Sequence, residues 1–329
     1  MTVRTGNLIL ALTAVIATTS LLACSSATTT PRTPTTPTTA SPQAQPTIVV
    51  TTDIWGDVVG QIVSCGGGSV EVLMPTGADP HDFAPSSAQL AGMQDAQLVI
   101  ANGLGLESGM QDALIELSEG GGNVLEMAPL LDPLPFSAPD EHGDEHGDEH
   151  GALDPHVWFD LQRMAKAAVL IGAELDALND GRGRYADCAQ QVADSFTSTD
   201  SQIRTALANV PEERRILVTD HDALGYFAEA YDFTVVGTVI PAGSTLAEPS
   251  GRDIADLAAT VAELGVPAIF ANIAQPRDLA QAVATESGKQ VQVIPLYVEG
   301  LGEPGSGADT YLGLMRSNAE LIAAGLGSS

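Results

Sequence analysis

The stretch IVVTTDIWGDVVGQIV, residues 48–63, joins a β-branched run to apolar residues at helical spacing, which predicts a strand followed by a helix. Further short apolar runs follow at residues 70–74, 97–101 and 124–125, each separated by a helix-like stretch with Gly or Pro. Strands that alternate with helices favour a parallel sheet covered by helices. This part of the chain therefore predicts an α/β domain.

The same alternation returns in the second half of the chain. Strands are predicted at residues 215–219, 234–239, 268–270 and 291–294, and helices at 222–230, 252–264, 277–286 and 309–324. Between the halves, a polar, Ala-rich stretch without internal Gly or Pro predicts one long helix, 183–209. We expect two doubly wound parallel-sheet α/β domains, 47–182 and 210–329, joined by this rigid helix with a ligand cleft between them.

The N-terminus has the pattern of an export signal. Arg4 precedes an apolar run, residues 8–23, that is too short to span a bilayer comfortably, so residues 1–23 are expected to be a signal peptide. The run ends in Leu-Leu-Ala-Cys, which resembles a bacterial lipobox with Cys24 as the lipidated residue; the alternative is an ordinary secretory signal. Residues 24–46 are rich in Ser, Thr and Pro and predict an extended tether. Together they predict an extracytoplasmic lipoprotein at the cell surface or in the periplasm.

The net charge excludes some classes of partner, and the cysteine content indicates a disulfide. The formal net charge is −29, with Lys166 and Lys289 as the only lysines, which argues against nucleic acid and anionic lipid as partners. Once Cys24 is assigned to the anchor, Cys65 and Cys188 remain as an even pair in an oxidising compartment. A disulfide between them is plausible, and neither has the spacing of a metal ligand.

The six histidines form two groups that indicate metal binding. His81 and His156 each follow Asp-Pro, and His221 follows Asp; the others repeat every fourth residue in the acidic tract 141–150, as His142, His146 and His150. Imidazole suits Zn(II), copper, iron and nickel, and carboxylates neutralise the charge of the ion. Glycines within the tract disfavour a helix, so we expect an auxiliary metal-collecting loop, the alternative being a solvated charged loop.

Three candidate ligands follow predicted strands. His81 comes after the strand 70–74, His221 directly after 215–219, and Glu299 after residues 295–298. Open α/β sheets bind ligands at the carboxyl ends of their strands. One half would therefore contribute His81 and His156, and the other His221 and Glu299. Asp53 is an alternative carboxylate that we interpret as a helix cap.

Five segments carry a resemblance to a known family. They are GADPHDFAP (77–85), NGLGLE (102–107), DPHVWFD (154–160), TDHDALGYF (219–227) and LYVE (296–299). In this order, the chain from residue 47 to 325 resembles the zinc/manganese (TroA-like, cluster A-I) substrate-binding lipoproteins of bacterial ABC importers. The resemblance implies two α/β domains joined by a rigid helix, with a metal between them held by His81, His156, His221 and the residue at Glu299.

Two positions bear on which metal the resemblance implies. Similar proteins usually carry Asp where Glu299 stands, so Glu248 and Glu303 are alternative carboxylates, with Glu248 expected to be structural. The manganese receptors of the family generally have a carboxylate at the position of His221, so three imidazoles favour Zn(II) over Mn(II). A histidine-rich loop such as 141–150 is also common among the zinc receptors.

The expected function is capture, enclosure and hand-over of Zn(II) to an ABC importer permease, with no chemistry performed on the metal. The protein is expected to be a monomer, and a zinc chaperone outside the cytoplasm is a further candidate partner. Asp79, Asp154 and Asp220 could orient the imidazoles by accepting ring N–H bonds. The alternatives are a manganese receptor, a surface adhesin and a zinc hydrolase. The hydrolase is disfavoured because the sequence has no His-Glu-x-x-His motif and offers a carboxylate as fourth ligand.

Overall fold

The stretch 48–63 forms the predicted strand and helix, β1 (Thr47–Val50) and α1 (Asp53–Gly66). The computed structural model describes residues 47–136, 153–179, 183–240 and 243–327. Ile48, Val49 and Val50 are all buried because the strand has helices on both faces. The helix is capped by Thr52, whose hydroxyl accepts a hydrogen bond from Trp55 N at 3.3 Å.

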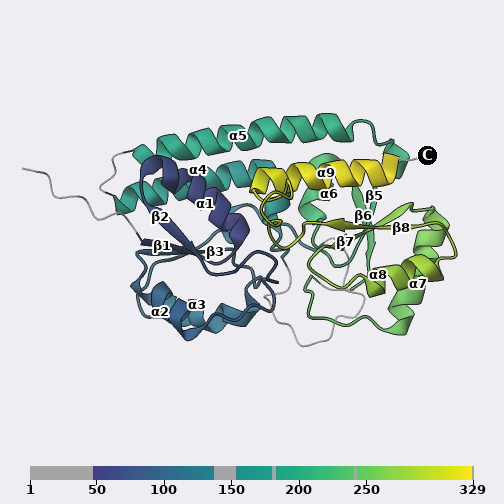
Figure 1. Ribbon diagram of the computed structural model, residues 1–329, viewed down its shortest axis with the longest axis horizontal. Coiled ribbons are helices and arrows are strands. Elements are labelled where there is room, and N and C mark those ends of the chain that lie inside the picture. The colour runs from purple at the N-terminus through teal and green to yellow at the C-terminus, as the bar shows by residue number, and fades with distance from the viewer. Residues whose placement is uncertain (1–46, 137–152, 180–182, 241–242, 328–329) are drawn as a thin grey trace, which may run out of the picture. The chain divides into compact units, whose positions relative to one another are not determined.

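The first sheet is parallel throughout, in the strand order β2-β1-β3-β4. Its other strands are β2 (Ser69–Val72), β3 (Leu98–Ala101) and β4 (Val124–Glu126). Ile48 and Val50 pack in one buried cluster with residues of α1, whereas Val49 packs in another with residues of α2 (Ser87–Asp95) and α3 (Gln111–Glu119). Figure 1 shows α1 on one face and α2 and α3 on the other, so the sheet is doubly wound.

The second sheet repeats this topology, in the order β6-β5-β7-β8. Its strands are β5 (Ile216–Thr219), β6 (Thr234–Thr238), β7 (Ala268–Asn272) and β8 (Gln292–Leu296), all parallel. Its helices are α6 (Gly225–Tyr231), α7 (Gly251–Leu264), α8 (Asp278–Glu286) and α9 (Tyr311–Gly327). The predicted fold class is confirmed, and the strand ends differ from the prediction by one or two residues.

Two long helices connect the sheets. Helix α5 (Arg184–Leu207) forms within the stretch predicted as one helix, and it packs against α1 of the first half and α9 of the second (Figure 1). It also packs closely along α4 (Leu161–Leu178), a helix that the sequence analysis did not identify. A Cβ atom at Gly172 of α4 would lie 2.4 Å from the Cβ of Ala189, so the two helices approach at a position that has no room for a side chain. Short 3₁₀ helices complete the structure: η1 (Ser108–Met110), η2 (Ala128–Leu130), η4 (Val157–Phe159) and η5 (Glu212–Arg214).

A single hydrophobic cluster runs beneath these helices and serves both sheets. It includes Ile48 of β1, Phe196 of α5 and Leu217 of β5. The opposite face of each sheet packs in a cluster of its own, with Met93 and Leu114 in the first half and Val261 and Val283 in the second. We call the first cluster the shared core. Because it is continuous, the described residues belong to one compact unit, and the two halves are joined through this core.

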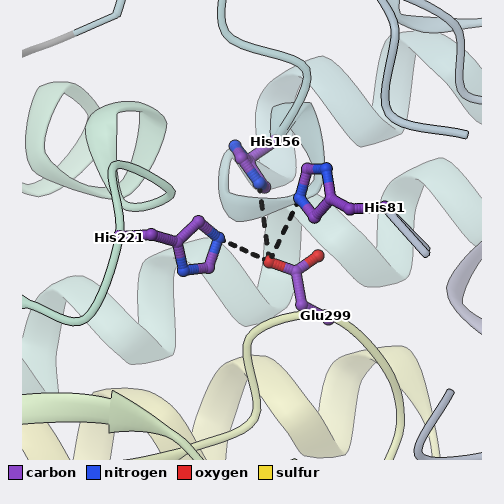
Figure 2. Close-up of side chains that lie close together, drawn as sticks. All are labelled: His81, His156, His221 and Glu299. Atoms are coloured by element: carbon purple, nitrogen blue, oxygen red, sulfur yellow. Dashed lines mark ion pairs between the residues drawn. The ribbon is translucent and has the colours of Figure 1, made fainter. Parts of the chain in front are cut away.

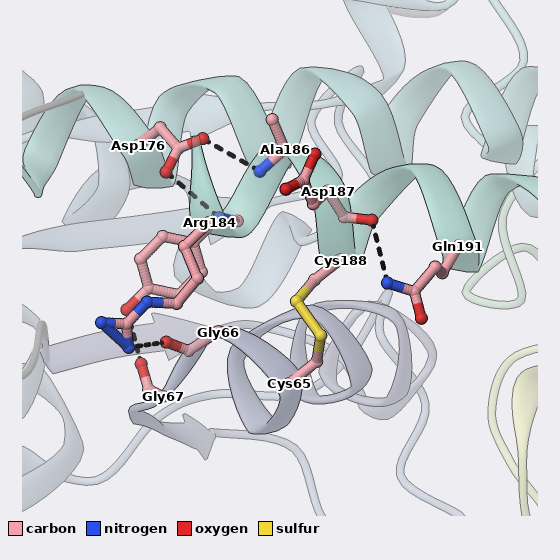
Figure 3. The surroundings of a disulfide bond; sticks show 10 residues. Cys65, Gly66, Gly67, Asp176, Arg184, Ala186, Asp187, Cys188 and Gln191 are labelled. Carbon is pink, nitrogen blue, oxygen red and sulfur yellow. Dashed lines mark hydrogen bonds between the residues drawn. A yellow bond between two sulfur atoms is a disulfide. The ribbon is translucent and has the colours of Figure 1, made fainter. Parts of the chain in front are cut away.

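The predicted disulfide is present. Cys65 in the last turn of α1 is bonded to Cys188 near the start of α5, with Cα atoms 5.9 Å apart (Figure 3). Next to it, the carboxylate of Asp176 accepts hydrogen bonds from the backbone N atoms of Tyr185 at 3.1 Å and Ala186 at 2.9 Å, which satisfies the first turn of α5. The bridge therefore ties α1 of the first half to α5, the helix that packs against both halves.

Several predictions concern segments outside the described residues. These are the signal peptide 1–23, Cys24, the tether 24–46, and the tract 141–150 with His142, His146 and His150. Within the part of the chain that the structure describes, no helix is both long enough and apolar enough to cross a membrane.

Candidate metal centre

His81 lies in a tight turn after β2 that an aspartate organises. Asp79 Oδ1 accepts a hydrogen bond from His81 N at 2.9 Å, and Asp79 O accepts from Phe83 N at 3.0 Å. Gly77, with φ of 80°, provides the positive φ that a side chain would disfavour at the start of this turn. The sequence Gly-Ala-Asp-Pro-His thus determines a local conformation that presents the imidazole inward, where it is buried.

His156 is oriented by the aspartate two residues before it. Asp154 Oδ1 accepts from His156 N at 2.9 Å and lies 2.7 Å from His156 Nδ1, so Nε2 is left as the free ring nitrogen. The carbonyl of Pro155 between them accepts from Asn102 Nδ2 at 2.9 Å, which joins this segment to the end of β3. This confirms the predicted orienting role of Asp154.

His221 repeats the arrangement after β5. Asp220 Oδ1 accepts from His221 N at 3.0 Å and lies 3.2 Å from His221 Nδ1. The second oxygen of Asp220 accepts from Asn272 N at the end of β7, at 2.8 Å. Asp220 therefore orients the imidazole as predicted, whereas Asp79 bonds the main chain of its histidine and directs its other oxygen elsewhere.

Glu299 follows β8, and its loop is held on both sides of the carboxylate. Val298 O accepts a hydrogen bond from Trp158 Nε1 at 3.1 Å, and Leu301 N donates to Asp53 Oδ2 at 3.0 Å. Burial raises the pKa of Asp53 to about 6, although the hydrogen bond from Leu301 acts in the opposite sense. Asp53 was predicted to cap α1, but the capping side chain is that of Thr52, one residue earlier. Asp53 is the first residue of the helix, and its carboxylate holds the Glu299 loop.

These four side chains converge on one point (Figure 2). Glu299 Oε1 lies 2.6 Å from His221 Nε2, 3.5 Å from His156 Nε2 and 3.8 Å from His81 Nε2. One donor atom from each side chain lies within 4.8 Å of all the others. Four donors held 2.0–2.2 Å from a tetrahedral zinc ion are themselves about 3.3 Å apart, so the spacing fits a single small cation.

The convergence leaves polar atoms buried without hydrogen bonds. The four side chains are at most 3% exposed. None of the three Nε2 atoms and neither oxygen of Glu299 has a hydrogen-bond partner, and the 2.6 Å contact to His221 is not aligned as a hydrogen bond. Buried polar groups normally find a partner because leaving them without one costs free energy. A cation at the centre would satisfy all four residues together.

The charges of the cluster are strongly coupled. Burial favours neutral imidazole, but the charge and hydrogen bond of Asp154, together with nearby Glu299, outweigh it and raise the pKa of His156 to about 9. The pKa of His221 is raised in the same way by Asp220 and Glu299, against the effect of burial. Burial favours the neutral form of Glu299 as well, but the three histidines hold its pKa well below its usual range. Without a metal, therefore, protons take the place of the cation.

The alternative carboxylates lie elsewhere. Neither Glu248 nor Glu303 belongs to the cluster, and both are exposed. Asp53 is also outside it. Within the described residues, His81, His156, His221 and Glu299 form the one group of acidic, histidine or cysteine side chains with the spacing of a metal site.

Glu107, a buried carboxylate that was not predicted as a functional residue, supports the site. Glu107 accepts hydrogen bonds from Thr51 Oγ1 at 2.7 Å, Asn102 N at 2.7 Å and Gly103 N at 3.1 Å. Burial raises its pKa, and these hydrogen bonds counteract that rise. Through Asn102 and Pro155 it connects the ends of β1 and β3 to the His156 segment. The motif Asn-Gly-Leu-Gly-Leu-Glu contained this residue, but nothing in its local sequence indicated that the carboxylate would be buried.

Comparison with known proteins identifies the family. Residues 48–325 match the family described as ZnuA, zinc-uptake complex component A, periplasmic. The chain belongs to the ZnuA family. The resemblance carried by the five sequence segments is thereby confirmed.

Relatives of known structure and name cover nearly all of the described chain. Zinc-binding protein TroA of Treponema pallidum is 30% identical over 292 residues, which are 87% of this chain and 91% of TroA. Manganese-binding lipoprotein MntA of Halalkalibacterium halodurans is 30% identical over 280 residues, 85% of this chain and 88% of MntA. The solved structure of T. pallidum TroA superposes with a TM-score of 0.76 at 29% identity, covering 86% of this chain and 100% of that one.

Membership in the ZnuA family defines the class of function. The protein is a metal-binding, substrate-binding component of an ABC importer and not an enzyme. Its site agrees with that class, because Glu299 is the fourth side chain of the cluster, whereas a hydrolytic zinc site keeps one position open for water. The metal is accordingly cargo.

Proposed function

We propose that this protein is an extracytoplasmic zinc receptor that binds Zn(II) through His81, His156, His221 and Glu299. The observation that carries the proposal is the convergence of three imidazole Nε2 atoms and one carboxylate in a fully buried site. Three nitrogens and one oxygen make a four-coordinate donor set of the kind that zinc prefers, whereas manganese favours carboxylate, carbonyl and water oxygens. The donor set therefore supports zinc as the cargo.

The names of the relatives do not choose between the two metals. One 30% identical relative is named as zinc-binding and another as manganese-binding. The preference for zinc thus rests on His221, which supplies a third nitrogen in place of a further oxygen. Replacing His221 with Asp is expected to shift the site toward manganese.

Hand-over completes the proposed function. The receptor is anchored through Cys24, extends on the tether 24–46, and delivers zinc as a monomer to the permease of its importer. Several relatives are themselves named as lipoproteins of metal transporters, which supports the anchor. The tract 141–150 is proposed to collect zinc for the main site.

The test has to go beyond relative affinity. Any site of this kind binds Zn(II) more tightly than Mn(II), because zinc lies above manganese in the Irving–Williams order. We therefore compare the ratio of the two dissociation constants, measured by competition calorimetry on residues 25–329, between the parent and His221→Asp. The ratio is expected to move toward manganese in the variant, and His221→Ala is expected to lose most of the zinc-induced rise in melting temperature.

A growth experiment in the host distinguishes a zinc receptor from a manganese receptor. Deleting the gene is expected to slow growth in chelator-treated medium, with recovery on adding zinc and none on adding manganese. Recovery with manganese alone would show the protein to be a manganese receptor. An unchanged zinc-induced thermal shift in His221→Ala would show that the metal binds elsewhere.

A further inference from the structure

Three of the four proposed ligands have sequence neighbours that pack in the shared core. Val157 and Trp158 next to His156, Ala223 and Leu224 after His221, and Val298 before Glu299 all belong to it. The apolar residues around His81 pack differently: Met74, Ala78 and Phe83 belong to the separate cluster with α2 and α3. The ligands are therefore divided three to one, and His81 is the exception.

Hydrogen bonds also attach the segment that carries His156 to the second half of the chain. Trp158 Nε1 donates to Val298 O at 3.1 Å, and Tyr311 of α9 donates to Trp158 O at 2.7 Å. On the other side, Tyr226 of α6 donates to Asp154 O at 2.7 Å. The segment that carries His156 is thus bonded to α6, which follows His221, and to Val298, which precedes Glu299, in addition to its bond to Asn102 at the end of β3.

The His81 turn is bonded to the second half through Asp79. Its Oδ1 holds His81 N, and its Oδ2 accepts from Thr245 Oγ1 at 2.5 Å and from Gln275 Nε2 at 2.7 Å. Thr245 follows β6 and Gln275 follows β7, so both donors belong to the second half. One carboxylate therefore fixes the conformation of the ligand turn with one oxygen and attaches that turn across the site with the other.

We propose that Asp79, Thr245 and Gln275 form a clasp that closes His81 onto a preassembled site of His156, His221 and Glu299. The inference rests on the proposed function, since it describes how the same site opens and closes. In this scheme Asp79 is a positioning residue: it does not contact the metal, but it keeps His81 in reach of it. Metal leaves when the clasp opens and His81 withdraws with its turn.

The clasp is suited to this task because it is small and only partly buried. Each of its two bonds is an interaction with a carboxylate, which is stronger than a neutral hydrogen bond, yet both end on the same oxygen and can be lost together. The His156 segment, in contrast, is held to the second half by three separate bonds and by buried aromatic side chains. Opening at His81 therefore disrupts less of the structure than opening at His156.

The clasp is tested by removing its donors and leaving Asp79 in place. In the double variant Thr245→Val, Gln275→Leu, the bond from Asp79 to His81 N remains, so the turn itself is not altered. The matched control is Thr260→Val, Gln281→Leu, which removes the same groups from a half-buried position on α7 and an exposed one on α8, both outside the clasp. Asp79→Asn serves as a second variant, because it replaces the acceptor oxygen and keeps the size of the side chain.

Two readouts are measured. The first is the zinc dissociation rate, followed by stopped-flow transfer to a chromophoric chelator. It is expected to rise ~10-fold or more in the double variant, as the loss of two bonds to a charged group implies, and to stay near the parent value in the control. The second is amide hydrogen exchange in the metal-free protein, where residues 77–85 are expected to exchange faster while residues 154–160 and 221–227 keep the parent rate.

Either readout can overturn the clasp. A dissociation rate within twofold of the parent, or an equal rise in exchange at residues 154–160, would contradict it. The exchange measurement needs no metal, so it tests the clasp even if calorimetry shows that the parent does not bind zinc, which would refute the proposed function instead.

Discussion

His221 Nε2 lies 2.6 Å from Glu299 Oε1, closer than the two other imidazoles lie to that carboxylate. Two donors on one tetrahedral zinc ion are about 3.3 Å apart, so this pair is tighter than a bound metal requires. Metal entry is therefore expected to separate them. Glu299 is the residue whose length matters most for that adjustment.

The first prediction compares substitutions of Glu299. Glu299→Ala should lose part of the zinc-induced rise in melting temperature, because three imidazoles remain and water replaces the carboxylate. Glu299→Asp should retain or improve it, because the shorter side chain relieves the close contact with His221. At a hundredfold excess over Kd, bound metal stabilises the folded state by about 2.7 kcal/mol, which sets the size of the full effect.

The control for this series is Glu248→Ala, since Glu248 is exposed and outside the cluster. All variants are measured by thermal unfolding with and without zinc, in protein lacking residues 141–150. If Glu299→Ala shifts as much as the parent does, the fourth ligand is water or another carboxylate.

The second prediction concerns protons. In the metal-free protein the pKa of His156 is about 9, so its imidazole is charged at pH 7, and zinc has to displace that proton. Binding at pH 7 should release at least one proton, and the zinc affinity should rise as the pH increases from 6 to 9. Calorimetry in two buffers of different ionisation enthalpy measures the release; heats that do not depend on the buffer would contradict it.

The same titration acts on the stability of the metal-free protein. Because the folded-state pKa of His156 is raised above the usual 6.5, its contribution to stability is fully present below pH 6.5 and is lost as the pH rises through about 9. The zinc-induced rise in melting temperature should therefore be larger at pH 8.5 than at pH 6. Thermal unfolding at both pH values tests this. A smaller zinc-induced shift at pH 8.5 than at pH 6 would contradict a raised pKa of His156 in the metal-free protein.

The third prediction concerns the disulfide. Cys65 and Cys188 are 123 residues apart in sequence, so the chain-entropy model gives a stabilisation of roughly 4–5 kcal/mol, of which proteins usually realise less. Cys65→Ser, Cys188→Ser should lower the free energy of unfolding by a few kcal/mol and leave zinc affinity nearly unchanged, since neither cysteine belongs to the His81, His156, His221 and Glu299 cluster. Urea unfolding with and without reductant checks the first part. Two free thiols in the unreduced, unfolded parent would refute the bridge itself.

The fourth prediction concerns the tract 141–150. Pro135 and Leu153 form an isolated antiparallel β-bridge, so the ends of the segment that contains the tract are held together without it. Deleting residues 141–150 should leave one tight zinc site and remove only weaker binding, because the glycine-containing sequence of the tract predicts ligands that lose conformational entropy when they bind. Zinc calorimetry on the deletion variant is the measurement. Loss of the tight site would mean that His81, His156 and His221 are not sufficient.

Much of the fold could be predicted because its signals are local. The strands of both sheets are short runs of β-branched and apolar residues, as expected where parallel strands are buried on both faces. The same logic was available for α4, whose buried residues Leu161, Met164, Ala168, Ile171 and Leu175 repeat at helical spacing, yet it was not identified. The capping of α1 was placed one residue late because Thr52 and Asp53 both favour helix starts, and only the backbone conformation separates them.

The four side chains proposed as ligands could be named from the sequence, but the long-range contacts that hold them in place could not. Each Asp that precedes a ligand histidine bonds that histidine's own backbone N, and this contact spans only one or two residues. The second partners of Asp79 lie 166 and 196 residues away. Nothing in the local sequence around Thr245 or Gln275 indicates such a contact.

By itself, the sequence determined the types of donor, the local turns that present them and the positions of most strands and helices, because these depend on interactions between residues close in the chain. Only the tertiary structure decided that the four side chains are buried together without hydrogen-bond partners, and that the His156 segment and Asp79 are bonded to the second half. The physical reason is that these relations depend on how two sheets pack against one layer of helices, and on bonds to backbone atoms such as Val298 O, which every residue type offers alike.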